Sequence, residues 1–178
     1  QEFPNANIEI VDSLNLSTSI GLLVMKACDF RKEGMNVQEI STKIQELTSK
    51  VRTTFVVNTL DYLHKGGRCT ALQNLIGTAF KIKPVVKVVN GELTISQKIR
   101  GNKNKVTDLI LKEVLKNENN IDTRRLFIGH SQGKKHIEYL KEQLLKSTNI
   151  KNIHLIKAGC VISSHCGPGT IGLYYIEK

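Results

Sequence analysis

The sequence predicts an α/β fold with a mixed sheet and helices on both sides of that sheet. Strand-like apolar runs alternate along the chain with segments of helical periodicity, as in α/β proteins. Asn90-Gly91 separates two strand-like runs, 82–89 and 92–99, and supplies the positive φ angles of a two-residue hairpin turn. A strand, a helix and a strand over residues 125–157 indicate a β-α-β crossover with parallel strands. An antiparallel hairpin and a parallel unit together predict a mixed sheet.

The chain opens with a predicted short strand and helix. Residues 7–12 alternate between apolar and polar side chains, which is typical of a half-buried strand. A hydroxyl-rich turn over 13–19 leads into an apolar helix that continues through Phe30. Gly34 is expected to end that helix.

A second helix is predicted to begin at Asn36. Glu39 follows Asn36 by three residues, the spacing of a capping box. Apolar residues then repeat at helical spacing at Val37, Ile40, Ile44 and Leu47. The later predicted elements are a buried strand (53–57), a short helix (59–65) that Asn58 caps and Gly66-Gly67 ends, a helix (70–80), the hairpin, a polar-faced helix (103–116), a loop (117–122), a strand (125–129), a helix (134–146) and a strand (152–157).

Length and composition are those of a globular chain. The 178 residues, 40% of them hydrophobic, suffice for one α/β core of ordinary size or somewhat more. No apolar run approaches the roughly 20 residues of a membrane helix, so we expect no stable membrane insertion. Without a leading hydrophobic segment or a C-x-x-C pair, the four cysteines are predicted to be free thiols in a cytoplasmic protein.

The net charge of +10 raises the possibility of a polyanionic partner. Lys98, Arg100, Lys103 and Lys105 form a local basic cluster, but few aromatic residues accompany them to stack on bases. A solvated surface or an acidic protein partner explains the charge equally well, so no nucleic acid is predicted. The spacing of Cys160, His165 and Cys166 matches no usual zinc pattern, so no metal is predicted either.

The segment over 160–172 places His165 among small residues, beside a Gly167-Pro168-Gly169 turn. An apolar run leads in and an alternating run over 171–176 leads out, which predicts a strand, a tight turn and a strand. His165 would lie uncrowded at a strand end, where glycine backbone could direct N–H groups at an anionic head group. The alternative is a histidine that only completes hydrogen bonds within a turn.

A second motif, Gly129-His130-Ser131-Gln132-Gly133, has the G-x-S-x-G form of a nucleophile elbow. It follows an apolar strand and opens a helix, and acids and histidines follow in hydrolase order, at Glu138 or Glu142 and then His154 or His165. Those acids lie within the helix after the serine, whereas a triad acid belongs on a later strand end. A serine hydrolase is therefore the alternative function, and the favoured role of Ser131 is a helix cap.

Several motifs in fixed order resemble the DegV family, which consists of bacterial fatty-acid-binding proteins. The motifs are Val11-Asp12-Ser13 with residues 19–24, residues 55–68, Ile82-Lys83-Pro84 with Gly91, Lys98-Ile99-Arg100-Gly101, and the His165 segment. The similarity extends from near Ile8 to the last residues.

The resemblance implies a two-lobed protein that buries a long-chain fatty acid between its lobes, with the carboxylate near the surface. A dihydroxyacetone-kinase-like subunit of fatty acid kinase would phosphorylate that carboxylate to an acyl phosphate. Residues 1–50 would be the end of the first lobe with a connecting helix, and 51–178 the C-terminal lobe. The resemblance places the rest of the first lobe outside this chain. The chain is then a lipid-presenting subunit with no catalysis or cofactor of its own.

The resemblance also assigns site residues. His165 corresponds to the family histidine in the head-group network, while Arg68 and Arg100 correspond to arginines that face the partner kinase. The apolar residues expected to line the fatty-acid tail are Ile20, Phe55, Val57, Leu75, Ile76, Phe80 and Ile162. Periodicity does not separate a tail-lining residue from an ordinary core residue.

Overall fold

A computed structural model describes residues 4–68, 82–101 and 103–178 of the chain. The predicted helix at 70–80 lies outside these residues. The described elements are α1 (Thr18–Lys32), α2 (Val37–Thr48), β1 (Val51–Val56), α3 (Asp61–Lys65), β2 (Ile82–Val89), β3 (Glu92–Arg100), α4 (Lys103–Asn117), the 3₁₀ turn η2 (Glu118–Asn120), β4 (Leu126–Ser131), α5 (Lys134–Ser147), β5 (Ile153–Lys157), α6 (Cys160–Cys166) and β6 (Thr170–Ile176). Within this part of the chain, every helix is too short or too polar to cross a membrane.

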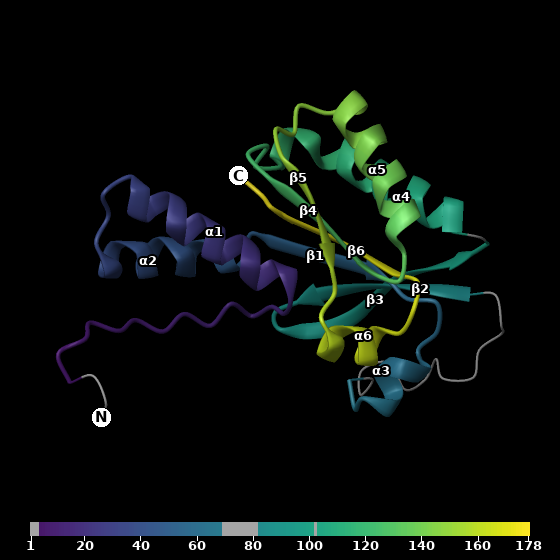
Figure 1. The fold of residues 1–178 in the computed structure, drawn as a ribbon, viewed down its shortest axis with the longest axis horizontal. Helices are drawn as coiled ribbons and strands as arrows, with labels where there is room; N and C mark the ends of the chain where they lie inside the picture. The colour runs from purple at the N-terminus through teal and green to yellow at the C-terminus, as the bar shows by residue number, and fades with distance from the viewer. Residues whose placement is uncertain (1–3, 69–81, 102) are drawn as a thin grey trace.

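Six strands form one mixed sheet in the order β3-β2-β1-β6-β4-β5 (Figure 1). β4 and β5 are parallel, and the other neighbouring pairs are antiparallel. The hairpin between β2 and β3 turns at Asn90 and Gly91, whose φ angles are 51° and 83°. The predicted mixed sheet, hairpin and β-α-β crossover are therefore confirmed.

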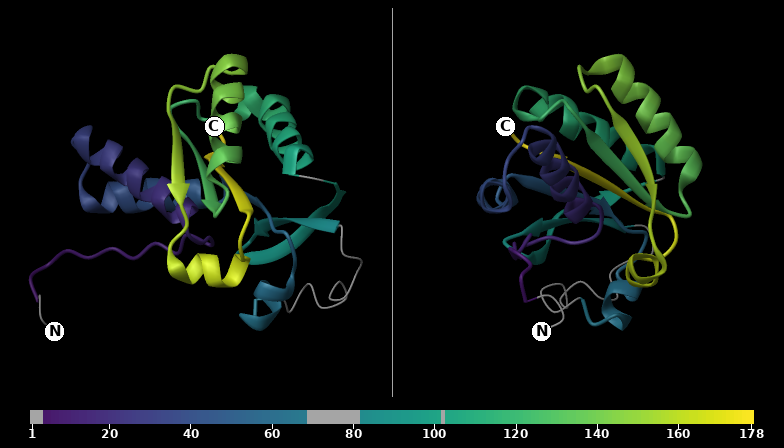
Figure 2. Two further views of the ribbon diagram at one scale, coloured as in Figure 1. Left: turned by 45° about the vertical axis from the view of Figure 1, so that its right-hand side comes forward. Right: turned by 60° about the vertical axis from the view of Figure 1, so that its left-hand side comes forward.

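Helices cover both faces of the sheet, as predicted (Figure 2). On the first face, α4 and α5 bury apolar side chains such as Ile110 and Leu140 against Ile128 and Leu173 of the strands. On the second face, α1 and α2 bury Leu22 and Ile44 against the sheet. α3 and α6 cover another part of the second face, described below. The proposed division at residue 50 stays a prediction.

The region before β1 confirms the two helices but not the first strand. The capping box of α2 is present, because Asn36 Oδ1 accepts a hydrogen bond from Glu39 N and Glu39 Oε2 accepts one from Asn36 N. Gly34 follows α1 with φ of 90°. The strand predicted at 7–12 is wrong: this segment lies outside the sheet, and Ile10 is 90% exposed. Alternation alone does not make a strand without a neighbouring strand to accept its hydrogen bonds.

The segment before the Gly167-Pro168-Gly169 turn is also corrected. Residues 160–166 form helix α6, whereas a strand was predicted, and only the second strand, β6, is confirmed. A short apolar run is ambiguous between helix and strand. The flanking glycines favour the helix. Gly159 is its N-cap residue, with an extended backbone, and Gly167 has a φ of 76°, the positive φ at which many helices end.

Candidate functional site

Three of the motif segments meet beyond the end of β1. Asn58 follows that strand, and its Nδ2 donates a hydrogen bond to Pro168 O at 2.7 Å. Its Oδ1 accepts a hydrogen bond from Lys83 Nζ at 2.6 Å. Asn58 was predicted to cap α3, but the N-cap residue is Leu60. The side chain instead joins the segments that contain β1, β2 and the α6–β6 turn.

His165 lies in the last turn of α6 and not, as predicted, at a strand end. Its Nδ1 is 2.8 Å from Val161 O. A carbonyl oxygen can only accept a hydrogen bond, so Nδ1 carries a proton and donates it. Nε2 is then an acceptor in the neutral ring and a donor in the charged ring, which suits it to a carboxyl group in either protonation state.

His165 and Arg68 both contact Gly66. A Cβ atom built on Gly66 would lie 2.3 Å from Cδ2 of His165, so the imidazole rests directly on the Gly66 backbone. Arg68 Nη1 donates a hydrogen bond to Gly66 O at 3.1 Å. The predicted head-group histidine and one predicted partner-facing arginine therefore contact the same glycine.

Arg100, the other arginine assigned to the partner face, is the exposed last residue of β3. It pairs with Ile82, at the same end of the sheet as Val56 and Val85. Because β3 lies two strands from β1, Arg100 is at the rim of the sheet and not beside Gly66.

The predicted tail residues fall into three groups. Phe55 and Val57 are buried in one cluster under α3 and α6, and the partly buried Ile162 packs against that cluster. Ile20 is 44% exposed on α1, away from the cluster. The last group, Leu75, Ile76 and Phe80, lies outside the described residues. The structure therefore brings Phe55, Val57 and Ile162 together.

An apolar groove of about 260 Å³ lies between α1, α2 and the extended segment before α1. Ile20 lines this groove together with Val24, Val37 and other apolar side chains. The groove is thus a second apolar region on the same face of the sheet as the cluster under α3 and α6.

Tyr174 is buried on the same face of the sheet, in the cluster under α1 and α2. Burial raises the pKa of its hydroxyl, the neighbouring Cys166 side chain raises it further, and a hydrogen bond with Thr18 opposes them. Tyr174 pairs with Thr53 of β1, whose hydroxyl shares a hydrogen bond with Ser19, so the tyrosine lies beside the start of α1. Burial also raises the pKa of the Cys166 thiol to about 11, so that thiol stays neutral and unreactive near pH 7.

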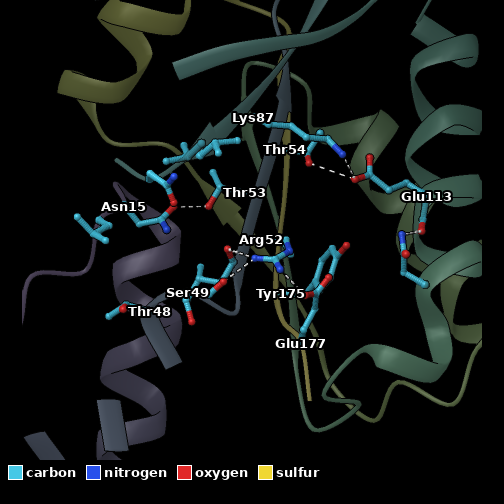
Figure 3. Close-up of a pocket in the computed structure, with 16 residues that line it drawn as sticks. Asn15, Thr48, Ser49, Arg52, Thr53, Thr54, Lys87, Glu113, Tyr175 and Glu177 are labelled. Carbon is cyan, nitrogen blue, oxygen red and sulfur yellow. Dashed lines mark hydrogen bonds and ion pairs between the residues drawn. The ribbon is translucent and has the colours of Figure 1, made fainter. Parts of the chain in front are cut away.

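A polar pocket of about 490 Å³ lies at the opposite end of β1 (Figure 3). Its charged side chains pair with one another: Arg52 with Glu177, and Lys87 Nζ with Glu113 Oε1 at 2.8 Å. Thr54 Oγ1 also donates to Glu113 at 3.3 Å. These pairs neutralise the pocket, which the sequence did not predict.

The hydrolase motif does not form a nucleophile elbow. Ser131 is the last residue of β4 and only 5% exposed, while the positive φ of 54° belongs to Gln132. In an elbow the strained turn lifts the serine itself clear of the sheet. The prediction that Ser131 caps the following helix is also wrong, because the N-cap residue of α5 is Gly133.

The structure describes His, Cys, Asp and Glu side chains within residues 4–68, 82–101 and 103–178. These residues contain no group of three or more His, Cys, Asp or Glu side chains that could hold an ion. Cys69 lies outside that range.

Sequence reasoning missed Gly66, Tyr62 and the bridging role of Asn58. A Cβ atom on Gly167 would lie 2.4 Å from Tyr62 Cδ2, so the tyrosine ring rests on that glycine. The available signal was the pair of glycine-rich ends, at Gly66-Gly67 and after α6. Both were interpreted only as turns, although close approach by a ring also requires glycine.

Comparison with known proteins gives a consistent match. The family model described as "Uncharacterised protein, DegV family" matches residues 1–178. A DegV domain-containing protein of Clostridium acetobutylicum is 33% identical over 172 residues, which are 97% of this chain and 60% of that protein. The chain thus spans about 60% of the length of the curated relatives it matches.

Solved structures agree with that match. A DegV family protein from Thermus thermophilus, described by its fatty acid binding, is 27% identical with a TM-score of 0.86, covering 99% of this chain and 63% of that one. A fatty acid binding DegV family protein from Streptococcus agalactiae is 29% identical with a TM-score of 0.79, covering 99% and 62%.

Proposed function

The chain belongs to the DegV family, and we propose that it binds a long-chain fatty acid and presents the carboxylate to a partner kinase. The observation that carries the proposal is the convergence on Gly66 of His165, assigned to the head group, and Arg68, assigned to the partner. The description of two similar solved proteins as fatty acid binding supports the choice of ligand.

The head group would meet His165 at Nε2. Since Nδ1 already donates to Val161 O, a carboxylic acid would donate to neutral Nε2, or the imidazolium would donate to a carboxylate. Either arrangement shares one proton between the ring and the ligand. This contact offsets part of the cost of removing a carboxylate from water.

The tail would supply most of the affinity. A sixteen-carbon chain has about 14 methylenes, and burying each is worth roughly 0.8 kcal/mol, or about 11 kcal/mol before costs. We propose that the tail passes from the α6 end toward α1, because the apolar cluster under α3 and α6 and the apolar groove beside α1 lie on the same face of the sheet. The groove that Ile20 lines would then be its far end.

The partner would be a dihydroxyacetone-kinase-like subunit that supplies nucleotide and metal. Phosphoryl transfer to the carboxylate requires positioning and charge compensation, so no catalytic group is assigned to this chain. Arg68 and Arg100 are exposed at the same end of the sheet and would meet an acidic kinase surface. A cytoplasmic location stays a prediction.

Native mass spectrometry of the purified protein tests the ligand. We expect a co-purifying mass that matches a long-chain fatty acid. An empty protein that also fails to take up palmitate would overturn the proposal. Covalent labelling of Ser131 by a fluorophosphonate would support a hydrolase instead.

His165→Ala tests the head-group assignment. We expect palmitate to remain bound, because the tail dominates affinity, while acyl phosphate formation by the kinase falls. His154→Ala is the matched control. His154 is on β5, an edge strand that lies three strands away from β1, and its ring packs on Phe127. Unchanged turnover in His165→Ala would remove the histidine from the mechanism.

A further inference from the structure

Helices α3 and α6 end in a reciprocal arrangement. The C-cap residue of α3 is Gly66 and that of α6 is Gly167. The ring of His165, from α6, rests on Gly66, and the ring of Tyr62, from α3, rests on Gly167. We call these the two ring-on-glycine contacts. The two helices lie side by side beneath the sheet in both figures (Figure 1, Figure 2).

Close approach, and not backbone conformation alone, requires glycine at Gly66. Its φ of −79° is available to any residue, yet a Cβ atom there would lie 2.3 Å from His165 Cδ2 and 2.9 Å from Nε2. At Gly167 the φ of 76° already favours glycine, and a Cβ atom would lie 2.4 to 2.8 Å from three atoms of the Tyr62 ring. Each contact therefore fixes one helix end against the other.

From this geometry we infer that Tyr62 is a positioning residue for His165. Its ring holds Gly167, two residues after His165, and so sets where α6 ends relative to α3. That position places the imidazole on Gly66, whose carbonyl accepts from Arg68. The inference rests on the proposed function for its consequence: Tyr62 would keep the head-group ring and the partner-facing arginine at a fixed separation.

The exposure of Tyr62 distinguishes this role from core packing. The side chain is 40% exposed, whereas Leu63 beside it is 2% exposed. A half-exposed aromatic residue contributes less burial to stability than a core residue does. Asn58 also holds the turn after α6 through Pro168 O, so the helix end stays attached when the Tyr62 ring is removed. Loss of the ring should then shift His165 without unfolding the protein.

Proton NMR tests the positioning directly, without ligand or kinase. An aromatic ring shifts the resonances of protons beneath it, so the Gly167 Hα signals report on Tyr62 and the Gly66 Hα signals on His165. In Tyr62→Ala we expect the Gly66 signals to move as well as those of Gly167, and in Tyr62→Phe we expect neither to move much. Unchanged Gly66 signals in folded Tyr62→Ala would overturn the inference.

A second variant displaces the imidazole by another route. Gly66→Ala keeps an ordinary φ but inserts a methyl group where the His165 ring lies, so it should reproduce the effect of Tyr62→Ala. Gly159→Ala is the matched control, because a Cβ atom there meets nothing within 4 Å and φ is −65°. Loss of activity in the control equal to that in Gly66→Ala would contradict the inference.

Acyl phosphate formation from palmitate by the partner kinase gives the functional result. Because small misplacements of a site group slow a reaction severely, we expect kcat to fall about tenfold in Tyr62→Ala with little change in KM for palmitate. Tyr62→Phe should keep the wild-type kcat, because the ring and not the hydroxyl makes the contact. Failure of this expectation would overturn the inference. If the wild-type protein bound no palmitate, the proposed function would fail, while the Gly66 signals would still decide the positioning role.

Discussion

The two faces of the sheet differ in how completely their helices close them. Among the residues that the structure describes, the face under α4 and α5 buries one cluster of sixteen side chains, each at most 5% exposed. On the other face, the described residues form two smaller clusters, and apolar side chains of α1 are exposed among them, with Val24 56% exposed. The candidate site and the apolar groove are both on this open face. The closed face thus supplies stability, and the open face carries the features that suit a ligand.

Strand β6 contributes side chains to both faces of the sheet. Successive side chains of a strand point to opposite sides, so Leu173 and Tyr175 enter the closed core. Gly172 and Tyr174 face the other way, where Tyr174 lies over the paired glycines Gly129 and Gly172. Substitutions in one strand can therefore test the two faces separately.

The largest effect is expected on the closed face. Leu173→Ala removes a fully buried side chain from the main cluster and should lower the free energy of unfolding by about 2–5 kcal/mol. Val24→Ala, on the open face, should change it by no more than about 0.5 kcal/mol. Urea denaturation measures both. Similar losses in the two variants would mean that the faces do not differ in the way described.

A smaller loss is expected from crowding the open side of β6. A Cβ atom on Gly172 would lie 2.2 Å from the hydroxyl oxygen of Tyr174, a buried side chain with little room to move. Gly172→Ala should therefore cost about 1–3 kcal/mol in thermal or urea unfolding. An Ala variant as stable as the wild type would show that Tyr174 is loosely packed and the open face more adaptable than the structure indicates.

The helix cap of α2 tests how far the open face contributes to global stability. Asn36→Ala removes one half of the capping box and should cost about 1 kcal/mol. Gln38→Ala, at an exposed position in the same helical turn, is the control. Urea denaturation measures the free energy of unfolding of both variants. Equal and negligible losses of this free energy would indicate that α2 frays without affecting the rest of the fold.

The smallest effect concerns the ion pair between α1 and the start of β4. Hydrogen bonds from Arg125, opposed by partial burial and helped by Arg124, lower the pKa of Asp29 to about 2. A lowered folded-state pKa stabilises the fold above the unfolded value of 3.8, and this stability is lost as pH falls toward 2. Because solvent screens such pairs, the loss should stay below about 1 kcal/mol. In Asp29→Asn, unfolding measured between pH 4 and 2 should lack this component.

Elements governed by neighbouring residues were predictable from sequence. The Asn90-Gly91 hairpin and the Asn36 capping box depend on side chains within a few positions, and both are present. The predictions at 7–12 and 160–166 were wrong. An alternating segment or a short apolar run forms a strand only when another strand of the chain pairs with it. Helix α6 also shows that glycines at both ends of a short segment are as informative as its apolar residues.

The candidate site was predictable as a set of residues but not as a geometry. The motifs singled out His165 and Arg68, yet nothing in them indicated that both contact Gly66. Asn58 bonds to Pro168, 110 positions away, and such a contact leaves no local periodicity. The same holds for Tyr62, whose ring was expected only to belong to a short helix.

The position of β6 between β1 and β4 has a consequence for how the protein is made. The β1–β2–β3 and β4–α5–β5 segments are both translated before β6, the strand that pairs with both β1 and β4. Until residues 170–176 emerge from the ribosome, β1 and β4 therefore lack the strand that they share, and their edges are open to wrong pairing. Since His165 and Gly167 lie just before that strand, the site is completed only after both of these segments have been translated.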